Sequence, residues 1–110
     1  VAAIATVVWD GVNFTYQVNR GFGGLTRTAG EVAGCVDLDL DQGAVCGPNE
    51  AVADASFYFT DPTLPALLTM GAVSASLVIV AGVSRVRVCM INAAAAKADF
   101  SFNVIVLRAS

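Results

Sequence analysis

The chain has 110 residues, a net charge of −3 and no histidine, and 56% of its residues are hydrophobic while only 14% are charged. This length suits one domain covering residues 1–110, and six basic residues exclude the clustered positive surface that nucleic acid requires. Without histidine, a phosphate-binding glycine loop or zinc-type cysteine spacing, the sequence also predicts no enzyme, no cofactor and no bound metal.

The N-terminal part predicts a β-hairpin followed by a loop. Ala2–Trp9 is apolar and leads into Asp10-Gly11, a favoured hairpin turn. Because Val1–Trp9 lacks the basic segment of a signal sequence, no targeting peptide is expected. Gly21–Gly24 is expected to be a loop, since no lysine follows its glycines. Between the turn and this loop, polar residues alternate with a set that would face the core: Val12, Phe14, Tyr16 and Val18.

The next predicted strand carries acidic residues at alternate positions. Asp37, Asp39 and Asp41 alternate with apolar residues that would enter the core. Their spacing is similar to the start of a calcium-binding loop, but Gln42 stands where that loop requires glycine. A polar face on an exposed strand is the simpler interpretation, with calcium binding as the alternative.

The rest of the chain predicts further strands of the same kind. Phe100–Leu107 would place its even-numbered residues in the core, and Ile105 and Leu107 on the other face. Arg85 and Arg87 share one strand face and indicate an ion-paired or solvated surface, while Ala93–Ala98 suits one helical turn. With turn signals about every 8–12 residues, the whole pattern predicts an all-β, antiparallel sandwich or barrel of about seven to eight short strands.

Leu64–Val83 is an uncharged segment, but Pro65 and the β-branched cluster Val78–Val80 favour a strand over a membrane-spanning helix.

The apolar surplus of the chain has two explanations. The surplus then indicates a subunit interface, unless the 19 alanines merely inflate the count. The interface candidates come from the N-terminal strand, from a tyrosine that faces opposite Phe57 and Phe59, and from the Leu77–Val80 run: Ala3, Ala5, Val7, Tyr58, Val78 and Val80.

Cysteines and aromatic residues point to packing rather than chemistry. Cys35, Cys46 and Cys89 are too few for a disulfide scaffold, and their odd number predicts free thiols, with a Cys35–Cys46 bridge as the alternative. Most aromatic residues fall at alternating strand positions, which favours core packing over a platform for sugars or bases.

Three segments, residues 25–38, 83–88 and 98–108, resemble small β-sandwich modules of bacteriophage structural proteins. In such modules an Arg-x-x-Gly segment, here Arg27–Gly30, enters a strand. A D-x-x-F strand, here beginning at Asp99, ends in Leu-Arg and finishes the domain. The resemblance implies a virion component, most similar to a capsid decoration (cement) protein, and it identifies no ligand or catalytic residue.

We therefore expect a structural subunit on the capsid surface, assembled in the host cytoplasm. Its expected partners are the major capsid protein or other virion shell subunits, together with further copies of itself, as in a trimer. One alternative is a receptor- or carbohydrate-binding module of a phage fibre. Another is a self-assembling shell or pilus-like subunit that pairs through edge strands.

Overall fold

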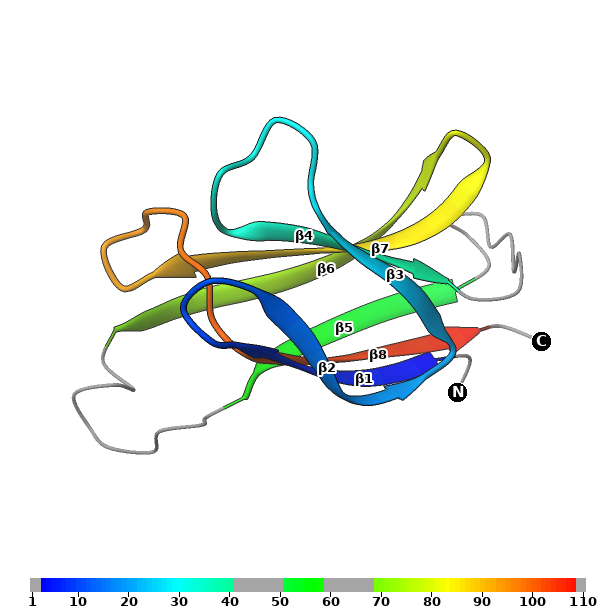
Figure 1. The fold of residues 1–110 in the computed structure, drawn as a ribbon, viewed down its shortest axis with the longest axis horizontal. Helices are drawn as coiled ribbons and strands as arrows, with labels where there is room; N and C mark the ends of the chain where they lie inside the picture. The colour runs from blue at the N-terminus through cyan, green and yellow to red at the C-terminus, as the bar shows by residue number, and fades with distance from the viewer. Residues whose placement is uncertain (1–2, 41–50, 59–68, 109–110) are drawn as a thin grey trace.

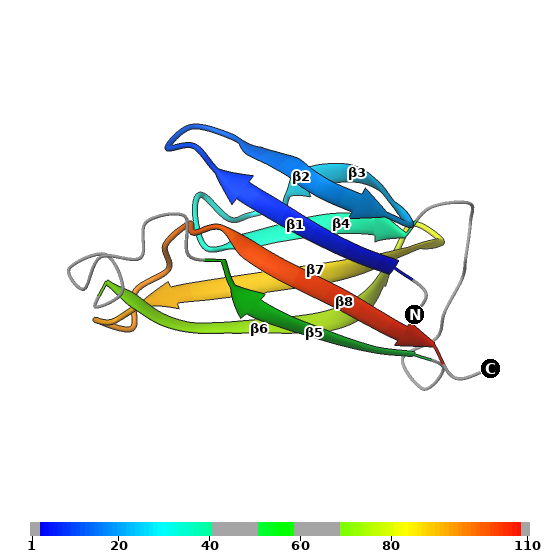
Figure 2. The same cartoon turned by 90° about the horizontal axis from the view of Figure 1, so that it is seen from below.

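The computed structural model of the chain describes residues 3–40, 51–58 and 69–108. These residues form two four-stranded antiparallel sheets packed face to face (Figures 1 and 2), so the predicted sandwich is confirmed and a closed barrel is not formed. The first sheet has the order β2-β1-β8-β5 and the second β3-β4-β7-β6. The strands are β1 (Ala3–Trp9), β2 (Phe14–Arg20), β3 (Phe22–Arg27), β4 (Cys35–Leu40), β5 (Ala51–Phe57), β6 (Met70–Val80), β7 (Val83–Asn92) and β8 (Phe102–Arg108).

Two hairpins close through the residues that their turns require. In the β1–β2 turn, Oδ1 of Asp10 accepts hydrogen bonds from the backbone N–H of Val12 and Asn13 at 2.8 and 2.7 Å. Val12 is 75% exposed there, so the expectation that it faces the core is wrong. In the β6–β7 turn, Ala81 and Gly82 both have positive φ, 52° and 79°, which is the two-residue turn that fits the twist of a hairpin.

The core consists mainly of alternate residues from the two central strands of each sheet, with Phe22 and Ala51 added from the edge strands β3 and β5. The inward faces predicted for residues 36–40 and 102–106 are confirmed, and residues 86–90 follow the same alternation. The largest fully buried side chains are Val7, Val36, Leu38, Val86, Val88, Met90, Phe102, Val104 and Val106. Strand β6 covers just over half of the uncharged segment Leu64–Val83, and the described part of the chain has no helix long and apolar enough to cross a membrane.

A bulge changes which face of β2 is buried. The register with β1 shifts between Thr6 and Val7, where Gln17 is the extra residue on β2. Phe14, before the bulge, packs against the core as predicted. Val18, beyond it, is 49% exposed on the outer face, because one extra residue reverses the alternation.

Gly21–Gly24 carries the chain from the first sheet to the second and is not a loop. Gly21 has φ 91° at the corner, and Phe22 enters the core as the first residue of β3. A Cβ at Gly24 would lie 3.0 Å from Oδ2 of Asp39, so glycine lets β3 approach the acidic strand closely.

The helical turn expected at Ala93–Ala98 is replaced by an irregular turn. Oδ1 of Asn92 accepts hydrogen bonds from the backbone N–H of Ala94 and Ala96 at 2.9 and 3.1 Å. Ala95 has a positive φ of 62°. The asparagine side chain gives the backbone a local alternative to helical hydrogen bonds, which outweighs the helix propensity of alanine.

Candidate functional site

Three of the interface candidates lie in the core of the domain. Ala3, Ala5 and Val7 are 2%, 0% and 0% exposed and face the second sheet from β1. These three residues are therefore not available at the surface for a subunit interface. Their size has a packing reason instead, because small side chains on β1 fit beneath the large ones contributed by the facing strands.

The other three candidates lie outside the core and are partly exposed. Tyr58 follows β5 and donates its backbone N–H to the carbonyl of Ser101 at 3.0 Å. Val78 and Val80 lie on β6, at the edge of the second sheet, near a hairpin tip that Figure 1 shows bent away from β5 and β8. The structure thus does not bring the six candidates together on one surface.

The acidic strand pairs with the two arginines of β7. Asp37 accepts hydrogen bonds from Nε and Nη2 of Arg87 at 2.9 and 3.2 Å, and from the hydroxyl of Thr28 at 2.8 Å. Asp39 Oδ1 lies 2.7 Å from Nε of Arg85, an electrostatic contact without the alignment of a hydrogen bond. We call Asp37, Asp39, Arg85 and Arg87 the ion-pair ladder. It confirms an ion-paired face for the arginines, whereas the expected exposed acidic face is wrong at Asp37, which is 2% exposed.

The ladder holds the carboxylate of Asp37 in the charged form. Burial by itself would raise the pKa of Asp37, but hydrogen bonds from Arg87 and Thr28 and the charges of both arginines outweigh burial and lower that pKa below 3.8. The hydrogen bond to Asp37 in turn raises the pKa of Arg87. Within residues 3–40, 51–58 and 69–108, no group of three or more acids or cysteines is placed to hold a metal ion. Asp41, the third acid of the calcium alternative, lies outside the described residues.

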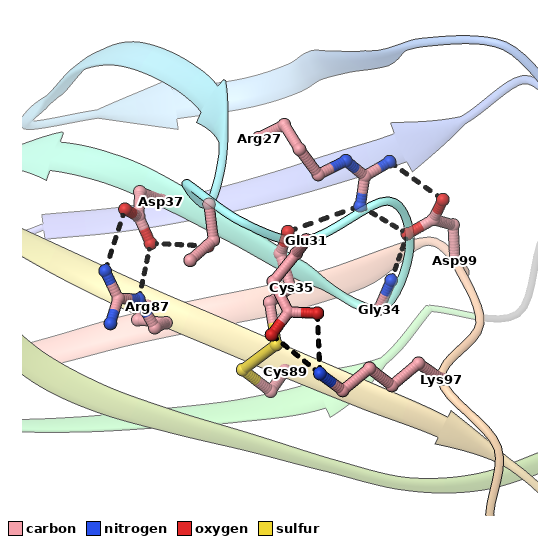
Figure 3. The surroundings of a disulfide bond; sticks show 10 residues. Arg27, Glu31, Gly34, Cys35, Asp37, Arg87, Cys89, Lys97 and Asp99 are labelled. Atoms are coloured by element: carbon pink, nitrogen blue, oxygen red, sulfur yellow. Dashed lines mark hydrogen bonds and ion pairs between the residues drawn. A yellow bond between two sulfur atoms is a disulfide. The ribbon is translucent and has the colours of Figure 1, made fainter.

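Beside the ladder, a disulfide bond joins β4 to β7 (Figure 3). Cys35 and Cys89 are directly opposite in the register, with Cα atoms 4.1 Å apart, although 54 positions separate them along the chain. The prediction of free thiols is therefore wrong for these two residues. Neighbouring antiparallel strands bring such pairs close enough to bridge, and sequence spacing gave no sign of this pairing. Cys46, the partner in the alternative pairing, lies outside the described residues.

A second ion pair, which we call the clamp, fixes one end of the sandwich. Nη1 and Nη2 of Arg27 donate to the two carboxylate oxygens of Asp99 at 2.7 and 2.8 Å, and Asp99 also accepts the backbone N–H of Gly34 at 2.8 Å (Figure 3). The guanidinium lies 5.9 Å from the ring centroid of Trp9 and 5.3 Å from that of Phe14. Two of the segments that carry the family resemblance thus meet in space through one bidentate pair.

The aromatic residues near the clamp contact one another and do not form an open platform. The rings of Trp9 and Phe14 lie 4.6 Å apart, and Arg27 covers both. They line a hollow of about 310 Å³ that also includes Asn13 and Thr26. Because the ring faces are already in contact, this end of the domain does not favour stacking of a sugar ring.

The outer face of the first sheet carries several exposed apolar side chains beside polar ones such as Thr6, Ser56 and Asn103. Its exposed side chains include Val52 at 66% and Leu107 at 49%, which are opposite one another on β5 and β8. Ile4 on β1 is 40% exposed and pairs with Ile105 on β8. We call the following set the apolar face: Ile4, Val18, Val52, Ile105 and Leu107.

Sequence alternation predicted Ile105 and Leu107 on the outer side of their strand but not Ile4. Every residue from Ala2 to Ala5 is apolar, so hydrophobicity gave no alternation there. Side-chain size does alternate there, because small Ala3 and Ala5 flank the larger Ile4. Of these three residues, only the small pair lies in the core. Val18 was missed because nothing in the sequence marks the bulge at Gln17.

Comparison of the chain with family models, characterised proteins and solved structures gives no match. The function is therefore inferred from the surface of the domain itself.

Proposed function

We propose that the domain is a structural subunit that acts by protein–protein contact through the apolar face. The assembly that best accounts for it is a bacteriophage capsid, with the domain bound to the shell as a decoration subunit. The apolar face is the observation that carries the proposal. The outer face of a sheet in a monomeric sandwich is normally polar, whereas this one carries five aliphatic side chains over four strands, interspersed with polar residues.

Other features of the described residues support a structural role. The charged groups of the ladder and the clamp are engaged with one another in ion pairs. The disulfide crosslinks the two central strands of the second sheet. Virion surfaces are among the environments in which disulfides persist, so the bond suits a subunit on the outside of a shell.

The proposal is tested by sedimenting the chain with purified capsids of the virus that encodes it. Val52→Asp places a charge on the apolar face, and we expect it to abolish co-sedimentation. Val32→Asp is the matched control, because Val32 is 95% exposed in the β3–β4 loop, away from this face, and should sediment like the wild type. Equal binding of both variants, or no binding by the wild type, would contradict the proposal.

A further inference from the structure

One row of the apolar face runs across all four strands and ends in opposite charges. Arg20 on β2 pairs with Ile4 on β1, Ile4 pairs with Ile105 on β8, and Ile105 pairs with Asp54 on β5. Arg20 and Asp54 are both exposed, and neither forms an ion pair with another described residue. Three strand spacings of about 4.8 Å separate the two charges by about 14 Å, too far for them to contact within one chain.

From this row we infer that the apolar face binds a second copy of the chain in a two-fold dimer. The inference rests on the proposed function, because it names the partner for the same surface. With the two-fold axis parallel to the strands, the row of one copy runs opposite to that of its partner. Arg20 then faces the partner's Asp54, and Ile4 faces the partner's Ile105.

The charges also select this orientation over the other two-fold arrangement. With the axis across the strands, Arg20 would face the partner's Arg20, and Asp54 the partner's Asp54, which is repulsive at both edges. Facing sheets pack about 10 Å apart, with their strands about 30° from parallel. This angle moves Arg20 sideways from the partner's Asp54, and the long arginine side chain can span the offset. The row is thus complementary to itself in one orientation only.

The size of the face predicts how tight the dimer is. Four strands of about seven residues cover roughly 450 Å², below the ~800 Å² that each partner of a stable complex buries. We therefore expect a weak, concentration-dependent dimer. Because shell binding is proposed for the same face, we expect the dimer among free chains and its dissociation when they bind a capsid.

Charge reversal tests the inference. Arg20→Asp and Asp54→Arg should each raise the dimer Kd by about tenfold or more, measured by sedimentation equilibrium up to near-millimolar concentration. The double variant R20D/D54R should dimerise like the wild type, because both ion pairs reform with reversed sign. An equimolar mixture of the two single variants should form a heterodimer more tightly than either variant pairs with itself, since all four edge charges are then matched.

The result that overturns the inference is a wild type that stays monomeric throughout, or a double variant and a mixture that remain as weak as the single variants. These outcomes are distinct from failure of the proposed function. A monomeric chain that still sediments with capsids, and loses that binding in Val52→Asp, would retain the proposed function and refute the dimer.

Discussion

Asp37 connects two strands and the segment that follows β3 through a single carboxylate. It accepts hydrogen bonds from Arg87 and Thr28 and lies 4.0 Å from Arg85, and its side chain is 3% exposed. The side chains of Arg85 and Arg87 are a quarter to a third exposed. Water can therefore replace part of the hydrogen bonding and ion pairing that they lose if the carboxylate is removed. We expect Asp37→Asn to lower the free energy of unfolding by about 3 kcal/mol, at the low end for a broken buried pair.

The same residue should make stability depend on pH below about 4. Because the pKa of Asp37 is lowered from 3.8 by folding, its contribution is complete above that value and is lost as the pH falls through 3.8 toward the folded pKa. The urea midpoint of the wild type should therefore fall more between pH 5 and pH 3 than that of Asp37→Asn. Equal losses in the two proteins would show that Asp37 does not titrate as the geometry implies.

Several residues were identified correctly from sequence while their partners were not. Alternation placed Asp37 and Arg87 on polar strand faces, and the family resemblance drew attention to Arg27 and Asp99. The pairs that they form join residues 50 and 72 positions apart. A local pattern gives the face of a strand but not its neighbour, so neither pair could be predicted.

At the scale of elements, the disulfide is the strongest link between β4 and β7. Closing a loop of this length is worth about 4 kcal/mol in the chain-entropy account of disulfides. We expect reduction to lower the free energy of unfolding by about that amount, measured from urea midpoints with and without reductant. The double variant Cys35→Ser/Cys89→Ser should start near the reduced value and not respond to reductant.

Thiol counting gives an independent check of the same bond. The unreduced, denatured chain should expose at most one thiol, that of Cys46, in place of the three expected from the odd cysteine count. Alkylation of Cys35 or Cys89 without prior reduction would contradict the pairing.

Strand positions were largely predictable because alternation, Asp10-Gly11 and Gly82 are local signals. The bulge in β2 and the irregular turn after Asn92 were not. A bulge adds one residue without a consistent residue type, and the turn depends on a side-chain hydrogen bond that competes with the helix propensity of four successive alanines. Each error shifted side chains locally and left the number of strands within the predicted range.

For the whole molecule, the sequence could indicate a sandwich but not its strand order. β1 pairs with β8, from the opposite end of the chain, and β5 pairs with β8 rather than with β6, its next strand along the chain. Such distant pairings depend on how the whole chain packs. This order makes β1 a central strand of the first sheet, and thereby decides which of its side chains are core and which are surface.

Adjacent residues of β1 should therefore respond in opposite ways to the same substitution. Ala5 is fully buried, so Ala5→Asp would place an unpaired carboxylate in the core, at a cost of several kcal/mol against a total stability of about 5–15 kcal/mol. We expect this variant to unfold, whereas a role for Ala5 in a subunit interface would have left it folded and only impaired assembly. Ile4→Asp points outward and should keep the circular dichroism spectrum and melting temperature of the folded domain while losing self-association. If Ala5→Asp melts like the wild type, β1 does not lie between the two sheets as described, and the assignment of the apolar face to its other side fails with it.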